Sequence, residues 1–281
     1  GFLMRLSNVS KRCKLLALGA AAVLSLGLMA GCGSSDQSSS SGSGKTYKIG
    51  IVQLVEHNAL DAANKGFVDG LKERGFEEGK NITIDRQNAQ ADQSNLQNIA
   101  QRFVSAKMDL ICTIATPAAQ TMANATHDIP IVGTAITDYE GAKLVASNKE
   151  PKGNVTGTSD MNPVKEQIDL LLKIKPDAKT IGTVYCSSEV NSEVQVKAMK
   201  EYAESKGLTV KVATISTVND IQQAAQSLIG SVDAFYEPTD NIIASAMPTL
   251  IDITNATKVP VICGEPNMVK AGGLATYGID Y

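Results

Sequence analysis

The sequence predicts an α/β fold made of two doubly wound parallel-sheet lobes hinged around a cleft. Short apolar runs typical of strands alternate with amphipathic runs typical of helices, which implies parallel strands joined by right-handed crossovers. Some strands, such as 110–114, are apolar throughout, as burial on both faces of a sheet requires. The pattern occurs twice, since Ile49 and Ile181, like Gly75 and Gly207, are separated by 132 residues. Two similar lobes in tandem are therefore expected.

The N-terminal lobe is predicted over residues 46–158. A first helix over 60–74 ends before Gly75, the residue type that most often follows a helix C-terminus. Asp92 is expected to cap the next helix, whose apolar residues recur at helical spacing as far as Val104. The expected strands of this lobe are 48–53, 81–85, 110–114 and 129–132, and a third helix is expected over 118–126.

The C-terminal lobe is predicted over residues 159–281 and repeats this order. A helix over 191–205 is followed by Gly207, and Thr217 and Asp220 have the spacing of a capping box before another helix. The expected strands are 180–185, 208–214, 234–236 and 259–262, with a further helix starting at Asn241. The polar residues after strand 234–236 therefore correspond to those after strand 110–114 in the first half.

The N-terminus has the layout of a secretory signal, with basic residues over 1–14 and an apolar run over 15–29. The apolar run is shorter than the roughly 20 residues that a membrane span needs. Leu28-Met29-Ala30-Gly31-Cys32 looks like a bacterial lipobox, which implies a lipoprotein signal peptide over 1–31 and lipidation of Cys32. The alternative is a plain signal peptide with a chance cysteine. Residues 32–45 would form a Ser/Gly-rich tether.

Composition narrows the classes of function. The formal net charge is −3, and residues 1–31 hold four of the 26 basic residues and none of the 29 acidic ones, so the body is more acidic still. An acidic body argues against a nucleic-acid partner, because that binding depends on phosphate neutralisation. The five cysteines lack zinc-site or disulfide spacing, and two histidines leave few options for a metal site or triad. We therefore expect a binding protein without catalysis, metal or cofactor.

Six stretches carry a resemblance to a known family. They are 51–66, 88–96, Ile114-Ala-Thr-Pro-Ala-Ala-Gln120, Gly153-Asn-Val-Thr-Gly157, Asn191-Ser192 and Pro238-Thr-Asp-Asn241. The body over residues 48–281 resembles the substrate-binding lipoproteins of bacterial ABC importers, which have the type I periplasmic-binding-protein fold. More narrowly, it resembles the subfamily that includes binders of tryptophan, tyrosine and phenylalanine.

The resemblance implies a solute-binding component of an ABC importer. Such a monomer would be lipid-anchored outside the cytoplasm, would capture a small amino acid between its lobes, and would deliver it to a permease and ATPase complex. The narrower resemblance points to an aromatic amino acid. Two alternatives stay open: an extracellular sensing domain for a membrane signalling partner, and an importer protein for a non-amino-acid solute. Family members continue past the position of Tyr281, so the C-terminal part of the fold is expected to be missing from this sequence.

Candidate ligand-binding residues lie in the loops after the predicted strands, where parallel sheets bind their ligands. Glu56 could receive a ligand ammonium or complement a helix dipole, and His57 could bind the ligand or cap the helix. Ala115 and Thr116 open a helix, so its N–H groups and the Thr116 hydroxyl suit a carboxylate, with a plain N-cap as the alternative. Asp138 is a candidate for the rim of the cleft.

In the second half, Asp240 is the strongest candidate, because an unpaired carboxylate facing a cleft suits a ligand's α-ammonium group. Its alternative role is to cap the next helix. Tyr236 could stack on a ligand ring or belong to the core, and Glu265 is a second rim candidate. Three further residues could cap a helix or donate hydrogen bonds to a carboxylate: Ser187, Asn191 and Ser192. The sequence thus predicts that Asp240 holds the ammonium group, and Thr116 the carboxylate group, of one amino acid.

Overall fold

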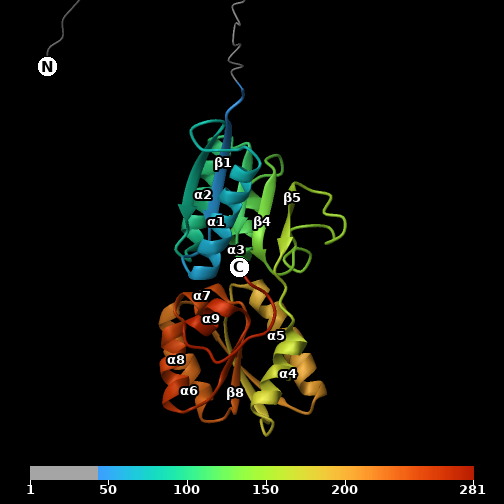
Figure 1. The fold of residues 1–281 in the computed structure, drawn as a ribbon, viewed down its shortest axis with the longest axis vertical. Helices are drawn as coiled ribbons and strands as arrows, with labels where there is room; N and C mark the ends of the chain where they lie inside the picture. The colour runs from blue at the N-terminus through green and yellow to red at the C-terminus, as the bar shows by residue number, and fades with distance from the viewer. Residues whose placement is uncertain (1–43) are drawn as a thin grey trace, which may run out of the picture. The chain divides into compact units, whose positions relative to one another are not determined.

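The structure, a computed structural model, describes residues 44–281 and contains two parallel β-sheets, one in each half of the chain (Figure 1). The predicted signal segment over 1–31, Cys32 and most of the predicted tether lie outside the described residues. None of the helices in residues 44–281 is long and apolar enough to cross a membrane. We call the part up to and including β5 (Val155–Ser159) the N-terminal lobe, and the part that follows the C-terminal lobe.

Five parallel strands form the sheet of the N-terminal lobe. Their order is β2-β1-β3-β4-β5, so the first strand of the chain lies inside the sheet. Three helices connect successive strands, and α2 and α3 pack against each other. The elements before β5 are β1 (Tyr47–Gln53), α1 (Asn58–Glu73), β2 (Ile82–Asn88), α2 (Gln93–Ser105), β3 (Leu110–Ile114), α3 (Thr116–Ala125) and β4 (Ile131–Ile136).

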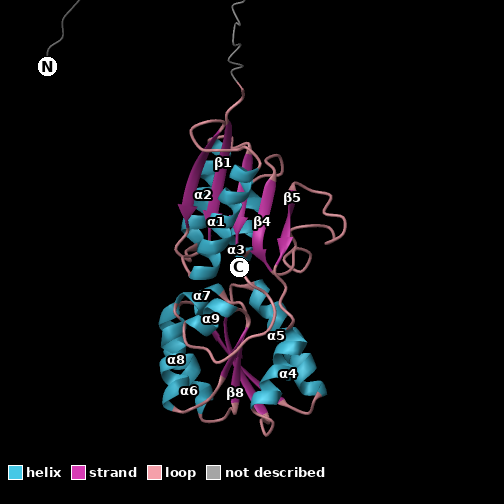
Figure 2. Ribbon diagram, in the orientation of Figure 1, coloured by secondary structure: helices cyan, strands magenta, loops and turns pink. Residues whose placement is uncertain are grey.

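Four parallel strands form the sheet of the C-terminal lobe, in the order β7-β6-β8-β9. Helices cover this sheet on two sides, with α4 and α5 on one side and α6 and α8 on the other (Figure 2). The elements are α4 (Val164–Ile174), β6 (Thr180–Cys186), α5 (Val190–Ser205), β7 (Thr209–Ile215), the short 3₁₀ helix η1 (Val218–Asp220), α6 (Ile221–Ile229), β8 (Ala234–Glu237), α7 (Asn241–Ser245), α8 (Met247–Ala256), β9 (Val261–Cys263) and α9 (Pro266–Lys270).

The shared strand order confirms the predicted fold of two similar α/β lobes, because β2-β1-β3-β4 and β7-β6-β8-β9 are the same arrangement. A matching side-chain contact occurs in both. Asp109, just before β3, accepts a hydrogen bond from the backbone N–H of Lys48 at 2.8 Å. Asp233, just before β8, accepts from the backbone N–H groups of Lys179 and Thr180 at 2.8 and 2.9 Å. Each acid therefore fastens the third strand of its lobe to the start of the first.

The helix ends follow the predicted local chemistry. Gly75 and Gly207, which follow α1 and α5, have positive φ angles of 86° and 81°, a conformation that glycine adopts without strain. The Asp92 side chain caps α2 by accepting a backbone hydrogen bond in its first turn at 2.8 Å. Thr217 and Asp220 form the predicted capping box, which here encloses η1 at the entry to α6. These ends fix where each strand-end loop turns into a helix.

Each lobe buries its own apolar core. In the N-terminal lobe, Phe103 of α2 is fully buried and packs over β1, where Gly50 leaves room for the ring. A Cβ atom on Gly50 would lie 2.8 Å from two carbons of that ring. In the C-terminal lobe, one apolar cluster lies under α4 and α5 and another under α6 and α8. Each lobe therefore has its own close-packed core, which holds the loops at its strand ends in place.

Four elements go beyond those the sequence pattern predicted, namely β5, α4, η1 and α9, and the first two lie where the chain passes between the lobes. β5 is an edge strand whose residues Thr156 to Ser159 are exposed, so it lacks the apolar run by which the other strands are recognised. α4 buries Val164, Ile168 and Leu171 at helical spacing. The residues between β5 and α4 form the passage from the first lobe to the second.

Candidate ligand-binding site

The polar loops at the strand ends of the two lobes meet each other directly. The Nε2 atom of His57, the N-cap residue of α1, lies 2.9 Å from Oδ1 of Asn241 at the start of α7. The Nε2 atom of Gln195 in α5 donates to Oγ1 of Thr137, the residue after β4, at 3.3 Å. Helices α3 and α5 are also in contact. The region between the lobes is therefore lined by the carboxyl ends of both sheets, where open parallel sheets bind ligands.

Ala115 and Thr116 form a strained, buried turn between β3 and α3. Ala115 has φ and ψ angles of 85° and 154°, which a residue with a Cβ atom rarely adopts. Thr116 is 1% exposed, and its hydroxyl oxygen has no hydrogen-bond partner. The N–H groups of a first helical turn also lack partners within the helix. A buried hydroxyl beside such a helix start suits an anionic group, and the binding of a carboxylate by Thr116 stays a prediction.

Asp240 corrects the sequence-based expectation of an unpaired carboxylate. Its side chain is fully buried and accepts three hydrogen bonds. Oδ1 caps α7 by accepting from the Ile243 N–H at 2.9 Å, and Oδ2 accepts from the Cys186 N–H at 2.8 Å and the Ser192 hydroxyl at 2.7 Å. The capping role, which was the alternative interpretation, is therefore the one found. Asp240 and Ser192 join β6, α5 and α7 to one another within the C-terminal lobe.

Glu189, which the sequence did not single out, is the second buried acid at the start of α7. Its two oxygens accept from the backbone N–H groups of Asn241 and Ile242 at 3.1 and 3.0 Å. They also accept from the side-chain amides of Asn241 at 2.7 Å and Asn191 at 2.9 Å. Asn191 is thus used within its lobe through Nδ2, whereas its buried Oδ1 has no partner. These contacts order the α7 terminus that faces the N-terminal lobe.

The acids of this region are buried without a cationic partner. Burial raises the pKa of Glu189 to about 8, with the neighbouring Asp240 charge adding to it. Burial also raises the pKa values of Asp240 and of Glu237 at the end of β8. Within residues 44–281, none of these three acids takes part in an ion pair. A cationic group of a ligand in this region would therefore meet no competing cation from the ion pairs of residues 44–281.

Tyr236 lies in the core of the C-terminal lobe and not at the cleft, which corrects the proposed stacking role. It is fully buried, its hydroxyl donates to Oε1 of Gln167 at 2.7 Å, and it accepts from Nδ2 of Asn162 at 2.9 Å. Its ring has no free face for a ligand. Glu265 is 3% exposed and caps α9 by accepting from the N–H groups of Asn267 and Met268, both at 2.7 Å, so it too has a structural role.

The remaining predicted residues are less deeply placed. Glu56 is exposed in the loop before α1. Burial lowers the pKa of the half-buried His57, against the opposing effects of the Asn241 hydrogen bond and nearby acids. Asp138 accepts from Nδ2 of Asn148 at 3.0 Å and so belongs to the β4–β5 loop. Ser187 is exposed, and its hydroxyl donates to the Ile215 carbonyl at 3.3 Å within its own lobe.

Asp160, which directly follows β5, is a further site residue that the sequence did not indicate. One carboxyl oxygen is hydrogen-bonded to the Tyr281 hydroxyl, and the other is buried without a partner. Burial raises the pKa of Asp160. It lines a cavity of about 530 Å³ between α1, β4, β5 and the end of the described chain. A correct prediction of β5 would have placed this acid at a strand end.

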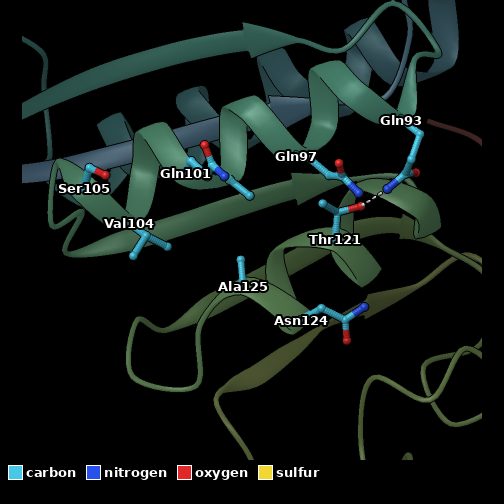
Figure 3. Close-up of a pocket in the computed structure, with 9 residues that line it drawn as sticks. Gln93, Gln97, Gln101, Val104, Ser105, Thr121, Asn124 and Ala125 are labelled. Atoms are coloured by element: carbon cyan, nitrogen blue, oxygen red, sulfur yellow. Dashed lines mark hydrogen bonds between the residues drawn. The ribbon is translucent and has the colours of Figure 1, made fainter.

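A second cavity, of about 550 Å³, lies away from the strand-end residues. It is a groove between α2 and α3, with Gln97 and Gln101 from one helix and Asn124 from the other (Figure 3). Gln93 closes one end by donating to the Thr121 hydroxyl at 3.2 Å. None of the predicted site residues lines this groove. In residues 44–281 there is also no cluster of three or more side chains that could hold a metal ion.

Two hinged α/β lobes with buried polar loops facing each other define a two-lobed ligand-binding protein. More particularly, residues 48–281 match the family described as ABC transporter substrate binding protein, and the chain belongs to that family. The family is one of solute-binding proteins and not an enzyme class, and its members act outside the cytoplasm.

Three relatives show the similarity in detail. The chain is 46% identical over 274 residues to the tyrosine-binding protein of Clostridioides difficile (strain R20291), covering 95% of this chain and 79% of that one. It is 43% identical to an ABC domain from Streptococcus pneumonia solved in complex with L-Trp, with a TM-score of 0.81 over 84% of this chain and 80% of that one. It is 50% identical to a ligand-free, open structure of a substrate-binding protein from Clostridium difficile, with a TM-score of 0.59 over 82% and 78%.

Proposed function

We propose that this protein binds an L-amino acid with an aromatic side chain between its lobes and presents it to an ABC permease and its ATPase. Two features of the region between the lobes carry the proposal. One is the acidic side, by which we mean the buried acids Glu189 and Asp240, which have no cationic partner. The other is the start of α3, where the Thr116 hydroxyl has no hydrogen-bond partner. The first suits an ammonium group and the second a carboxylate group. Relatives that bind tyrosine or L-Trp support the aromatic side chain.

Within this proposal, Thr116 and the N–H groups of α3 bind the ligand carboxylate, and Asp160 binds its ammonium group. β3 and β5 are two strands apart, or about 10 Å at the usual strand spacing. A hydrogen bond of about 2.9 Å at each end leaves about 4 Å between the ligand's own charged groups, which is the scale of an α-amino acid. Asp240 and Glu265 contribute negative potential from their capping positions and are not direct ligand contacts.

Isothermal titration with a panel of amino acids tests the proposal. L-Trp, L-Tyr and L-Phe are expected to bind, and L-Glu and L-Lys are not. Thr116→Val should weaken the affinity roughly 10- to 100-fold, because it removes a hydrogen bond to a charged group, whereas Thr116→Ser should retain most of it. Asp160→Asn should weaken binding by a similar factor, and Asp138→Asn serves as the matched control. Wild-type affinity of both Thr116→Val and Asp160→Asn would contradict the assignment.

We also propose that the mature protein is attached to the membrane through lipidated Cys32. The lipobox-like sequence before Cys32 supports this, and the residues from Cys32 to Gly44 form the connection to the N-terminal lobe. Cys32→Ser should move the protein from the membrane fraction to the soluble fraction of the producing bacterium. Mass spectrometry of the wild-type N-terminal peptide should show two or three acyl chains. An unmodified Cys32 in membrane-bound protein would contradict the lipid anchor.

A further inference from the structure

Two side-chain amides of the C-terminal lobe reach the N-terminal lobe. Gln195 of α5 donates from Nε2 to Oγ1 of Thr137, and Asn241 of α7 contacts Nε2 of His57 through its Oδ1. Gln195, Thr137 and Asn241 are buried, and His57 is half-buried, so water competes little for these bonds. Both contacts join residues that are far apart in sequence and belong to different lobes.

The Gln195 amide is oriented by its own lobe. Its Oε1 accepts from the Thr239 N–H at 2.9 Å. The two hydrogens of Nε2 face three acceptors, which are Oγ1 of Thr239 at 2.7 Å, the carbonyl of Asn191 at 3.1 Å and Oγ1 of Thr137 at 3.3 Å, so one hydrogen is shared between two of them. The acceptor must be Oε1 because the backbone N–H of Thr239 can only donate. Nε2 is therefore the atom presented to Thr137. All polar atoms of Gln195 are used by the protein, so it is not available as a ligand contact.

The Asn241 amide is oriented in the same way by Glu189. Nδ2 of Asn241 lies 2.7 Å from Glu189 Oε2, an oxygen that also accepts the backbone N–H of Asn241. Because Nδ2 is the donor to Glu189, Oδ1 is the atom that faces His57. It follows that Nε2 of His57 carries the proton of this contact. Glu189 thus determines which end of the amide meets the other lobe.

We propose that Gln195 and Asn241 are latch residues, which hold the two lobes together around the ligand by docking on Thr137 and His57. The latch rests on the proposed function, in which the ligand lies between the lobes. Because each amide is oriented within the C-terminal lobe, little side-chain freedom is lost when the lobes meet. The latch residues act through lobe closure and are positioning residues, with no direct contact to the ligand.

A difference between two relatives bears on the latch. The chain superposes on the L-Trp complex with a TM-score of 0.81 at 43% identity. It superposes on the ligand-free, open structure with a TM-score of only 0.59, although the identity is higher, at 50%. The arrangement in which Gln195 and Asn241 reach the N-terminal lobe is therefore more similar to that of the ligand complex.

The test places the substitutions in the N-terminal lobe, so that the networks of Gln195 and Asn241 stay intact. Thr137→Val and His57→Phe remove the partner atoms with little change in side-chain volume. Thr137→Ser and His57→Gln restore a hydroxyl and an Nε2 donor. Thr121→Val, in the α2–α3 groove, is the matched control for loss of a threonine hydroxyl elsewhere in the lobe. The melting temperature of each variant shows whether the fold is preserved.

The dissociation rate of L-Trp is measured by stopped flow, and the radius of gyration by X-ray scattering. Thr137→Val and His57→Phe should each raise the dissociation rate roughly two- to tenfold with little change in the association rate, and together by about the product. The Ser and Gln variants should recover most of the loss. Wild-type rates in Thr137→Val, His57→Phe and their double variant would overturn the latch.

The two proposals can fail separately. If the wild-type protein binds none of the amino acids, the proposed function fails. The latch is then tested by the radius of gyration from X-ray scattering alone. The double variant should have a larger radius of gyration than the wild type, because its lobes are no longer held together. Equal radii would overturn the latch, whatever the ligand proves to be.

Discussion

Asp240→Asn tests most sharply the difference between the role expected from the sequence and the one seen in the structure. In the wild type, Oδ1 caps α7 through Ile243, and Oδ2 accepts from the Cys186 N–H and the Ser192 hydroxyl. An asparagine can keep the cap, but its NH₂ group then faces the Cys186 N–H. The serine hydroxyl can turn to accept a hydrogen bond, whereas the backbone N–H cannot. One buried donor is left unpaired, which costs about 1–3 kcal/mol of stability.

An opposing effect depends on pH. The pKa values of Asp240 and Glu189 are raised in the folded protein, so the native state binds more protons than the unfolded chain as pH rises from the ordinary carboxyl range toward about 8. Wild-type stability therefore falls over that range. Asp240→Asn removes one of the two acids, so its stability should fall less. The loss of stability caused by the substitution should therefore be larger at pH 6 than at pH 9.

Urea unfolding followed by circular dichroism at both pH values measures this. Asp138→Asn is the matched control, because Asp138 bonds only within the β4–β5 loop, and it should change the unfolding free energy by less than about 0.5 kcal/mol. After allowance for any unfolded fraction, Asp240→Asn should weaken the affinity for the ligand less than Asp160→Asn does, because Asp240 contributes negative potential but no direct hydrogen bond to the ligand. Wild-type stability at pH 6 together with strongly weakened ligand binding would refute the capping role and make Asp240 a ligand contact.

Two further predictions concern Tyr236 and His57. Tyr236→Phe should lower the unfolding free energy by about 1–2 kcal/mol, because the hydrogen bonds to Gln167 and Asn162 are lost, and it should not change the ligand affinity. Weakened ligand binding by a stable Tyr236→Phe variant would instead place the ring in contact with the ligand. Burial lowers the pKa of His57 below its usual 6.5 when the lobes are in contact, so its neutral form favours contact. The affinity for the ligand should therefore fall as the pH drops below about 6.5, and His57→Gln should flatten this part of the pH profile. A profile for His57→Gln identical to that of the wild type would exclude His57 as its origin.

Local sequence patterns were sufficient for most of the fold. Strand 110–114 was predicted with the bounds that β3 has, because a short apolar run bounded by polar residues is typical of a strand buried on both faces. The caps at Asp92 and Thr217 were predicted because they depend on residues only three positions away. β5 was missed for the opposite reason: its residues are small, polar and mostly exposed, and pairing with β4 alone makes it a strand.

The candidate site was less accessible, because its contacts join residues far apart in the chain. The sequence could place Asp240 at a strand end, but not show that Cys186 and Ser192, about 50 positions away, would occupy one of its oxygens. The same holds for Glu189, whose partners belong to α7. Asp240 looked available in the sequence and is structural in the fold, and Glu189, which the sequence analysis did not single out, is structural as well. Thr116 differs, because its backbone turn and its neighbouring helix start are local features.

The central claim is that the region between the lobes recognises the charged groups of one amino acid. Isothermal titration of the purified protein with L-Trp, tryptamine and indole-3-propionate tests this most directly, since the two analogues lack the carboxylate and the ammonium group, respectively. The expected result is tight binding of L-Trp and a loss of roughly 10-fold or more for each analogue, because each leaves one charged hydrogen bond unmade. Binding of indole-3-propionate as tightly as L-Trp would contradict the role of the acidic side, and equally tight binding of tryptamine would contradict that of Thr116 and α3.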